Sequence, residues 1–182
     1  MKVVDTTIPD VKILEPQIMG DERGFFAEVW REEWAQLVGV VGGFKQDNVS
    51  GSRLGTLRGL HYQLKNPQGK LVRVSIGEVF DVAVDLRRSS PTFGKWVGEI
   101  LSANNKRMMW IPPGFAHGFL VLSDWAEFAY KCTDYYAPEW ERAVLWNDET
   151  IGIQWPVMEQ FDLVLSEKDK KASIFSQCES YP

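Results

Sequence analysis

Hydrophobic and polar residues alternate along much of the chain with the period of two that is typical of β-strands. Clusters of Gly, Pro, Asn and Asp interrupt the alternation and predict turns between short strands. A helix is expected at residues 31–38, ending at Gly39, and one or two further helical turns at residues 166–172. The strands are expected at residues 11–15, 25–30, 44–50, 57–63, 70–76, 78–86, 95–101, 107–111, 115–122 and 127–133.

Many short strands separated by turns predict an all-β fold. Within that class we expect a double-sheet jelly roll, that is, a β-sandwich or barrel with a few short helices. The 182 residues contain no repeat or low-complexity linker, so residues 1–182 are expected to form a single domain.

Two of the predicted strands carry polar residues that a buried strand usually lacks. In residues 57–63 the alternation places His61 and Gln63 on one face and Arg58 and Tyr62 on the other. Both faces therefore have hydrogen-bonding groups, and at least one is expected to line a cavity. In residues 78–86, Asp81 and Asp85 share a face, which predicts either a polar interior or a solvent-exposed face.

His61 and His117 are the two histidines of the sequence, and each has glycine and aromatic neighbours. Either could be a core histidine satisfied by a hydrogen bond, or a base, because the pKa of an unperturbed histidine lies near neutrality. A catalytic metal site usually has three protein ligands, so a metal would have to recruit Gln63 or a carboxylate such as Asp81. We therefore expect no metal.

Composition narrows the classes of partner. Hydrophobic residues make up 45% and charged residues 25%, as in soluble globular proteins. The net charge of −5 argues against a nucleic-acid surface, although internal arginines could still hold a small anion. Cys132 and Cys178 suggest no disulfide framework, so a cytoplasmic location is expected. Neither a secretory peptide nor a run of about 20 apolar residues is present, which predicts no membrane association.

Several motifs occur in order along nearly the whole chain. They are residues 20–28 (GDERGFFAE), 46–48 (QDN), 57–63 (LRGLHYQ), 68–73 (QGKLVR) and 110–119 (WIPPGFAHGF), extended by residues 77–85, 130–131 and 146–148. With these motifs the chain resembles the dTDP-4-dehydrorhamnose 3,5-epimerase family of cupins. The resemblance implies a cupin-like jelly roll that converts dTDP-4-keto-6-deoxyglucose to dTDP-4-keto-rhamnose without a metal or an organic cofactor.

Inverting a carbon next to a ketone requires a base, a group that stabilises the enolate, and an acid on the opposite face. His61 is the natural base, and Lys70 could stabilise the enolate unless it is a solvated turn lysine. Tyr130 lies in an apolar row and could be a core tyrosine, but the resemblance implies that it is the acid. Residues 166–169 read as a helix-capping box, yet the resemblance implies that Asp169 pairs with the catalytic histidine.

The resemblance also implies a site for a nucleotide diphosphate. Arg58 matches the pyrophosphate-binding arginine, whose planar group suits phosphate oxygens. Strict alternation places Arg58 and His61 on opposite faces, so the strand must bend or bulge near Gly59 if both reach the ligand. Further ligand-facing positions match Gln46, Asn48 and His117, and Tyr135 is a candidate to stack on the base.

In this family the N-terminal strands cross to a partner subunit, which implies a homodimer. Arg23, Phe26 and Glu28 would then complete the neighbouring site. Met19 stands where many relatives have an aromatic residue, which affects the packing expected around thymine rather than the chemistry.

Three other functions remain open at this point. A relative that inverts only carbon 3, or only carbon 5, would carry the same histidine, aspartate and tyrosine. A metal-dependent cupin oxygenase would contain stoichiometric metal. A catalytically silent sugar-nucleotide binder would have no need of a base and an acid together.

Overall fold

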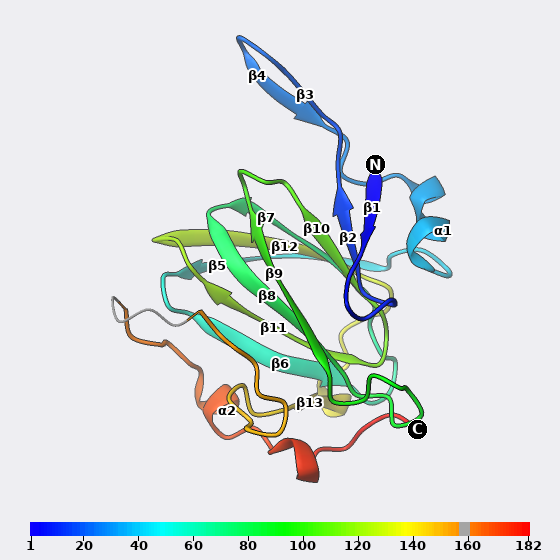
Figure 1. The fold of residues 1–182 in the computed structure, drawn as a ribbon, viewed down its shortest axis with the longest axis vertical. Helices are drawn as coiled ribbons and strands as arrows, with labels where there is room; N and C mark the ends of the chain where they lie inside the picture. Colours follow the sequence, from blue (N-terminus) through cyan, green and yellow to red (C-terminus); the bar gives the residue numbers. More distant parts are fainter. Residues whose placement is uncertain (157–160) are drawn as a thin grey trace.

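The computed structural model describes residues 1–156 and 161–182. These residues form two antiparallel sheets that face one another, together with a separate hairpin (Figure 1). The larger sheet has the strand order β1 (Lys2–Asp5), β2 (Lys12–Glu15), β10 (Met108–Ile111), β7 (Lys70–Ile76), β12 (Trp125–Cys132) and β5 (Gln46–Arg53). The smaller sheet has the order β13 (Glu141–Ala143), β6 (Leu57–Gln63), β11 (Phe115–Val121), β8 (Glu78–Asp85) and β9 (Trp96–Ser102). The predicted double-sheet β-sandwich is confirmed.

The inner faces of the two sheets form the main core. Alternate residues of each strand point inward, so one apolar set per strand meets the set of the facing sheet. This core includes Val72 and Val74 of β7, Phe119 of β11 and Phe128 of β12. The rings of Phe119 and Phe128 stack with centroids 4.2 Å apart and join the sheets directly. Burial of each such side chain contributes roughly 1.5–3 kcal/mol, so this layer holds the sandwich together.

Both outer faces are partly covered by other segments of the chain. Val82, Val84 and Ala116 of the smaller sheet pack beneath C-terminal residues such as Ile151 and Cys178. The larger sheet packs against residues 29–44, which include η1 (Glu32–Trp34) and α1 (Ala35–Val38). The C-terminal region contains η2 (Pro138–Trp140), α2 (Glu167–Lys170) and η3 (Phe175–Gln177). Within the described ranges, no helix is long and apolar enough to cross a membrane.

The hairpin of β3 (Ile18–Asp21) and β4 (Gly24–Ala27) projects away from the sandwich (Figure 1). It carries Met19, Phe25 and Phe26, whose surfaces are 52%, 62% and 63% exposed. Large apolar side chains that gather on a projecting element mark an interaction surface.

Two predicted elements differ from the structure, and three short strands were not predicted. The strand expected at residues 25–30 ends at Ala27, because Val29 and Trp30 turn to pack against the larger sheet. The helix expected at residues 31–38 begins as a 3₁₀ turn, although Gly39 ends it in the left-handed conformation as predicted. The pattern missed β1, β3 and β13, which are short strands whose pairing with β2, β4 and β6 fixes them.

Candidate active site

A cavity of about 320 Å³ is bounded by side chains of both sheets. The smaller sheet contributes His61 and Phe115, and the larger sheet contributes Lys70 and Tyr130. Its other lining residues are Gln46, Asn48, Tyr62, Gln63, Gln68, Tyr136, Glu141 and Tyr181. Groups on facing sheets can approach a bound molecule from opposite sides, which an inversion of configuration requires.

A β-bulge in β6 orients the side chains of this wall. The interval from Arg58 to His61 on β6 is matched by a shorter interval, from His117 to Phe119, on β11. Gly59 has a φ of +130°, and a Cβ there would lie 2.5 Å from the Cα of Gly118. The bulge predicted near Gly59 is therefore confirmed.

The bulge lets Arg58 reach across to the larger sheet. Its Nε donates to the hydroxyl of Ser52 on β5 at 3.1 Å. Its positive charge acts on Tyr130 of β12, where it opposes a rise in the pKa of the phenol. Arg58 thus contacts the larger sheet, but its side chain is exposed and is not among the residues that line the cavity with His61.

His61 is paired with Asp169. The imidazole Nε2 lies 2.6 Å from Oδ1 of Asp169, and the Asp169 side chain is 5% exposed. Burial favours the neutral acid, but hydrogen bonds from His61 and from the Ser166 hydroxyl outweigh it and lower the pKa of Asp169. The ionised carboxylate accepts a hydrogen bond from Nε2–H, so the other ring nitrogen of a neutral His61, Nδ1, carries no proton and can act as a base.

The predicted capping box coexists with this pair. Ser166 is the N-cap of α2, and its hydroxyl accepts a hydrogen bond from the Asp169 amide at 3.1 Å. The same hydroxyl donates to the Asp169 carboxylate at 2.8 Å. The helix start therefore holds the carboxylate in the orientation that reaches His61.

Tyr130 and Lys70 lie on the opposite wall, on neighbouring strands. Burial raises the pKa of Tyr130, so its phenol is a neutral proton donor at physiological pH. Burial lowers the pKa of Lys70, while the charges of Cys132, Asp81 and Glu141 oppose the shift. Lys70 is thus a lysine of the cavity and not a solvated turn residue.

His117 lies directly across from His61 in the smaller sheet, but in a different environment. Its side chain is 8% exposed, and its Nε2 lies 2.9 Å from a carboxylate oxygen of Asp81, which is fully buried. Burial lowers the pKa of His117, although Asp81 opposes the shift, and burial raises the pKa of Asp81 against the charge of His117. Of the two alternatives predicted for Asp81, a polar interior or a solvent-exposed face, the structure shows the polar interior.

The remaining predicted ligand residues fall into two groups. Gln46 and Asn48 line the cavity, and the Gln46 amide donates to Asn48 at 3.0 Å. Tyr135 lies near the cavity with its side chain exposed. Arg23, Phe26 and Glu28 lie on or just after the projecting hairpin, outside the cavity of their own chain, where Arg23 pairs with Asp21 and Glu28 with Arg31.

Sequence reasoning missed several cavity residues. Glu141 of β13 accepts a hydrogen bond from the Tyr136 hydroxyl at 2.8 Å and pairs with Lys168. Burial opposes ionisation of Glu141, but these two partners outweigh it and lower its pKa. The sequence could have identified Gln63 as a cavity residue, since the alternation placed it on the same face as His61. No sequence signal marked Tyr136, Glu141 or Tyr181, because backbone pairing with segments far away in the sequence brings them to the cavity.

In residues 1–156 and 161–182, no group of three or more His, Cys, Asp or Glu side chains is arranged to hold a metal ion. Each of the two pairs, His61 with Asp169 and His117 with Asp81, contains one histidine and one carboxylate.

The chain was compared with known proteins. The profile of the dTDP-4-dehydrorhamnose 3,5-epimerase family matches residues 5–177. A dTDP-4-dehydrorhamnose 3,5-epimerase from Pseudomonas aeruginosa is 55% identical over 183 residues, which cover 100% of each chain. The crystal structure of a 3,5-epimerase from Legionella pneumophila in complex with dTDP-4-keto-L-rhamnose is 54% identical, with a TM-score of 0.95 over 98% of this chain and 94% of that one. A 3′-monoepimerase from Streptomyces bikiniensis, solved with dTDP-quinovose, is 34% identical, with a TM-score of 0.87 over 94% of this chain and 87% of that one.

Proposed function

The chain belongs to the dTDP-4-dehydrorhamnose 3,5-epimerase family and is an isomerase of dTDP-rhamnose biosynthesis, and from this premise we propose how its residues divide the reaction. It binds dTDP-sugar ligands. The proposal concerns the roles of individual side chains, the oligomeric state and the location in the cell.

His61 is the base. Its unprotonated Nδ1 removes the proton from the carbon next to the C4 ketone, and Asp169 stabilises the imidazolium that forms. The electron pair of the broken C–H bond moves into an enolate, whose oxygen receives a hydrogen bond from Lys70. Tyr130 then donates its phenolic proton to the same carbon from the opposite side. Exchange with solvent returns a proton to Tyr130 and removes one from His61, which restores both groups.

The nucleotide occupies the polar part of the cavity and its rim. Arg58 binds the pyrophosphate, and Gln46 and Asn48 present amide groups toward the ligand. Tyr135, 64% exposed, is positioned to stack on the thymine. The resemblance to the family implies that His117 also faces the ligand, but His117 is buried against Asp81 and is not among the residues that line this cavity.

The functional unit is a homodimer of single-domain chains. The observation that supports it is the projecting hairpin, where Arg23, Phe26 and Glu28 lie outside their own cavity and apolar side chains are exposed. We expect these residues to complete the partner's site. Mixing inactive Arg23→Ala chains with inactive His61→Ala chains should restore activity, and no recovery in a verified heterodimer would contradict shared sites.

A cytoplasmic location is part of the proposal. Cys132 and Cys178 are both buried free thiols, as is usual for proteins of reducing compartments.

The observation that carries the mechanism is the His61–Asp169 pair facing Tyr130 and Lys70 across one cavity. The test is incubation of the protein with dTDP-4-keto-6-deoxyglucose in D₂O, with NMR detection at carbons 3 and 5. We expect deuterium and inverted configuration at both carbons, and dependence of both on His61. Exchange that survives in His61→Ala would overturn the assignment of the base.

A further inference from the structure

The last five residues of the chain, 178–182, form a segment that we call the C-terminal strap. Its end lies beside the loop after β8 (Figure 1). The amide of Tyr181 donates to the carbonyl of Leu86 at 3.0 Å, and the amide of Arg88 donates to the carbonyl of Tyr181 at 2.9 Å. The strap therefore pairs with this loop as a short strand would.

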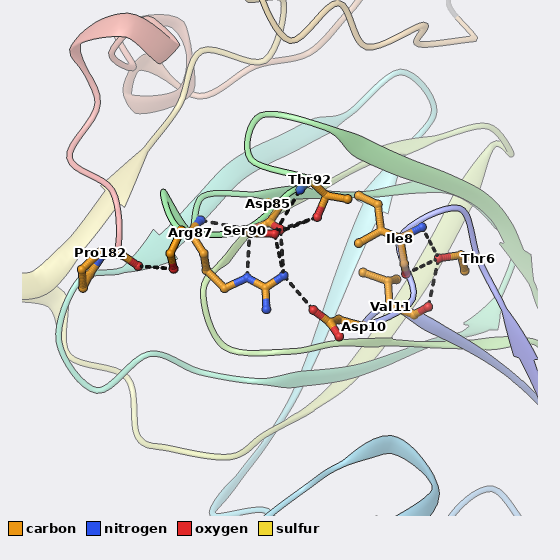
Figure 2. A network of polar contacts seen from close by, with 10 residues as sticks. Thr6, Ile8, Asp10, Val11, Asp85, Arg87, Ser90, Thr92 and Pro182 are labelled. Carbon is orange, nitrogen blue, oxygen red and sulfur yellow. Dashed lines mark hydrogen bonds and ion pairs between the residues drawn. The ribbon is translucent and has the colours of Figure 1, made fainter.

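A buried network orders the loop that receives the strap (Figure 2). The carboxylate of Asp85 accepts hydrogen bonds from the Arg87 guanidinium at 2.7 and 2.9 Å, and from the hydroxyls of Ser90 and Thr92 at 2.6 Å each. Burial opposes the charge, but these donors outweigh it and lower the pKa of Asp85 to about 2. The hydroxyl of Ser89 then donates to the carbonyl of Pro182 at 3.2 Å.

The side chain of Tyr181 lines the active-site cavity. Its hydroxyl donates to the backbone carbonyl of Gln63, the residue that ends β6, at 2.5 Å. Burial raises the pKa of Tyr181, so the phenol stays protonated at physiological pH and remains a donor.

Gln63 in turn holds the neighbouring wall. Its side-chain oxygen accepts from the amide of Ala137 at 3.0 Å, and its side-chain nitrogen donates to the carbonyl of Tyr135 at 3.3 Å. These two bonds hold the backbone on either side of Tyr136, whose hydroxyl donates a hydrogen bond to Glu141. A continuous chain of contacts thus runs from the strap through Gln63 to two side chains of the cavity wall.

We propose that Tyr181 is a positioning residue of the epimerase, which fixes Gln63 and thereby keeps the cavity wall closed around a singly inverted sugar until the second carbon has reacted. The proposal rests on the function above, in which one base serves both carbons. The ketone must then turn within the cavity between two proton transfers. A looser wall would release it after the first.

The test compares Tyr181→Phe with Ser180→Ala. The first variant keeps the ring and removes the hydroxyl that binds Gln63. The second is the matched control, because it removes one hydrogen bond of the same strap, from Arg88 at 2.6 Å, outside the cavity. We expect Tyr181→Phe to raise KM roughly three- to tenfold, the size of one net hydrogen bond, with a smaller change in kcat. NMR of early product mixtures should show a several-fold larger fraction of singly inverted sugar. Ser180→Ala should match the wild type in both quantities.

Wild-type KM and product ratio in Tyr181→Phe would overturn the proposal, as would equal changes in Ser180→Ala, which would indicate general loosening of the strap. A wild-type protein that fails to exchange both carbons in D₂O would instead contradict the proposed function. A chain ending at Ser180 should exceed the effect of Tyr181→Phe if it folds, and the phenylalanine variant decides the question if it does not.

Discussion

The two histidines of this protein are cross-strand neighbours in one sheet and each pairs with an aspartate, yet the two pairs have different properties. His61 and Asp169 meet at the cavity, where the imidazole is 28% exposed, and the pKa of the carboxyl is lowered. His117 and Asp81 are buried, and there the pKa of the carboxyl is raised and that of the imidazole is lowered. In the first pair, hydrogen bonds from His61 and Ser166 outweigh burial, and in the second burial prevails.

The difference shows that the pairing itself does not make a base. A base needs an ionised partner and a free nitrogen that the substrate can reach. Asp169 is held ionised by two donors at a helix start, and its histidine lines the cavity. His117 instead stacks on Phe128 in the core, with ring centroids 5.8 Å apart. Four predictions break or sharpen this contrast.

The largest effect is expected for His61→Ala. Removing a positioned base should lower kcat by roughly 10²–10⁴-fold, and deuterium exchange into the substrate should fall in parallel. The fold should remain intact, because His61 is partly exposed, although the loss of its hydrogen bond to buried Asp169 costs some stability. A variant that keeps more than about a tenth of the wild-type rate would show that His61 is not the base.

Tyr130→Phe should be next in size. The ring and its packing remain, but the donor opposite His61 is lost, so inversion should slow by about 10²-fold or more. His61 can still remove the proton, exchange it with D₂O and return it to the same face. The measurement is the ratio of deuterium in recovered substrate to product formed, which should rise in the variant. An unchanged ratio would move the acid's role to Lys70 or to a bound water.

Asp169→Asn and Asp81→Asn compare the two pairs directly. An amide at position 169 cannot stabilise the imidazolium, so kcat should fall by roughly one to two orders of magnitude. An amide at position 81 can still accept from His117, so kcat should fall less than about fivefold and stability should change by about 1 kcal/mol. Equal losses of kcat in the two variants would erase the distinction between the pairs.

The smallest effect is a difference in the pH dependence of stability. The lowered pKa of Asp169 contributes stability that is present above its unfolded-state pKa and is lost as pH falls through the folded-state pKa. The raised pKa of Asp81 acts in reverse, because its ionisation above the unfolded-state pKa costs stability. Urea unfolding at pH 3 to 6 should therefore show Asp169→Asn becoming more destabilising with rising pH and Asp81→Asn becoming less so. Parallel trends would contradict the opposite shifts.

The sequence by itself determined most strands of this protein, including residues 57–63, the strand that carries His61. Period-two alternation and turn residues are local properties, so residues 57–63 and 70–76 were predicted with the bounds that the structure has. The same local reasoning found the Ser166 cap and the Gly39 helix end, which each depend on backbone geometry over a few residues. The bulge at Gly59 was expected from the alternation together with the roles that the resemblance implies for Arg58 and His61.

Only the tertiary structure decided which polar residues meet. Asp169 lies 108 residues from His61 in sequence, and Tyr181 lies 118 residues from Gln63. Such encounters depend on the register and packing of segments far apart in the chain, which alternation does not encode. The tertiary structure also decided which histidine can act as the base. The two histidines are the same residue type, and they differ in burial and in the surroundings of the carboxylate that each one contacts.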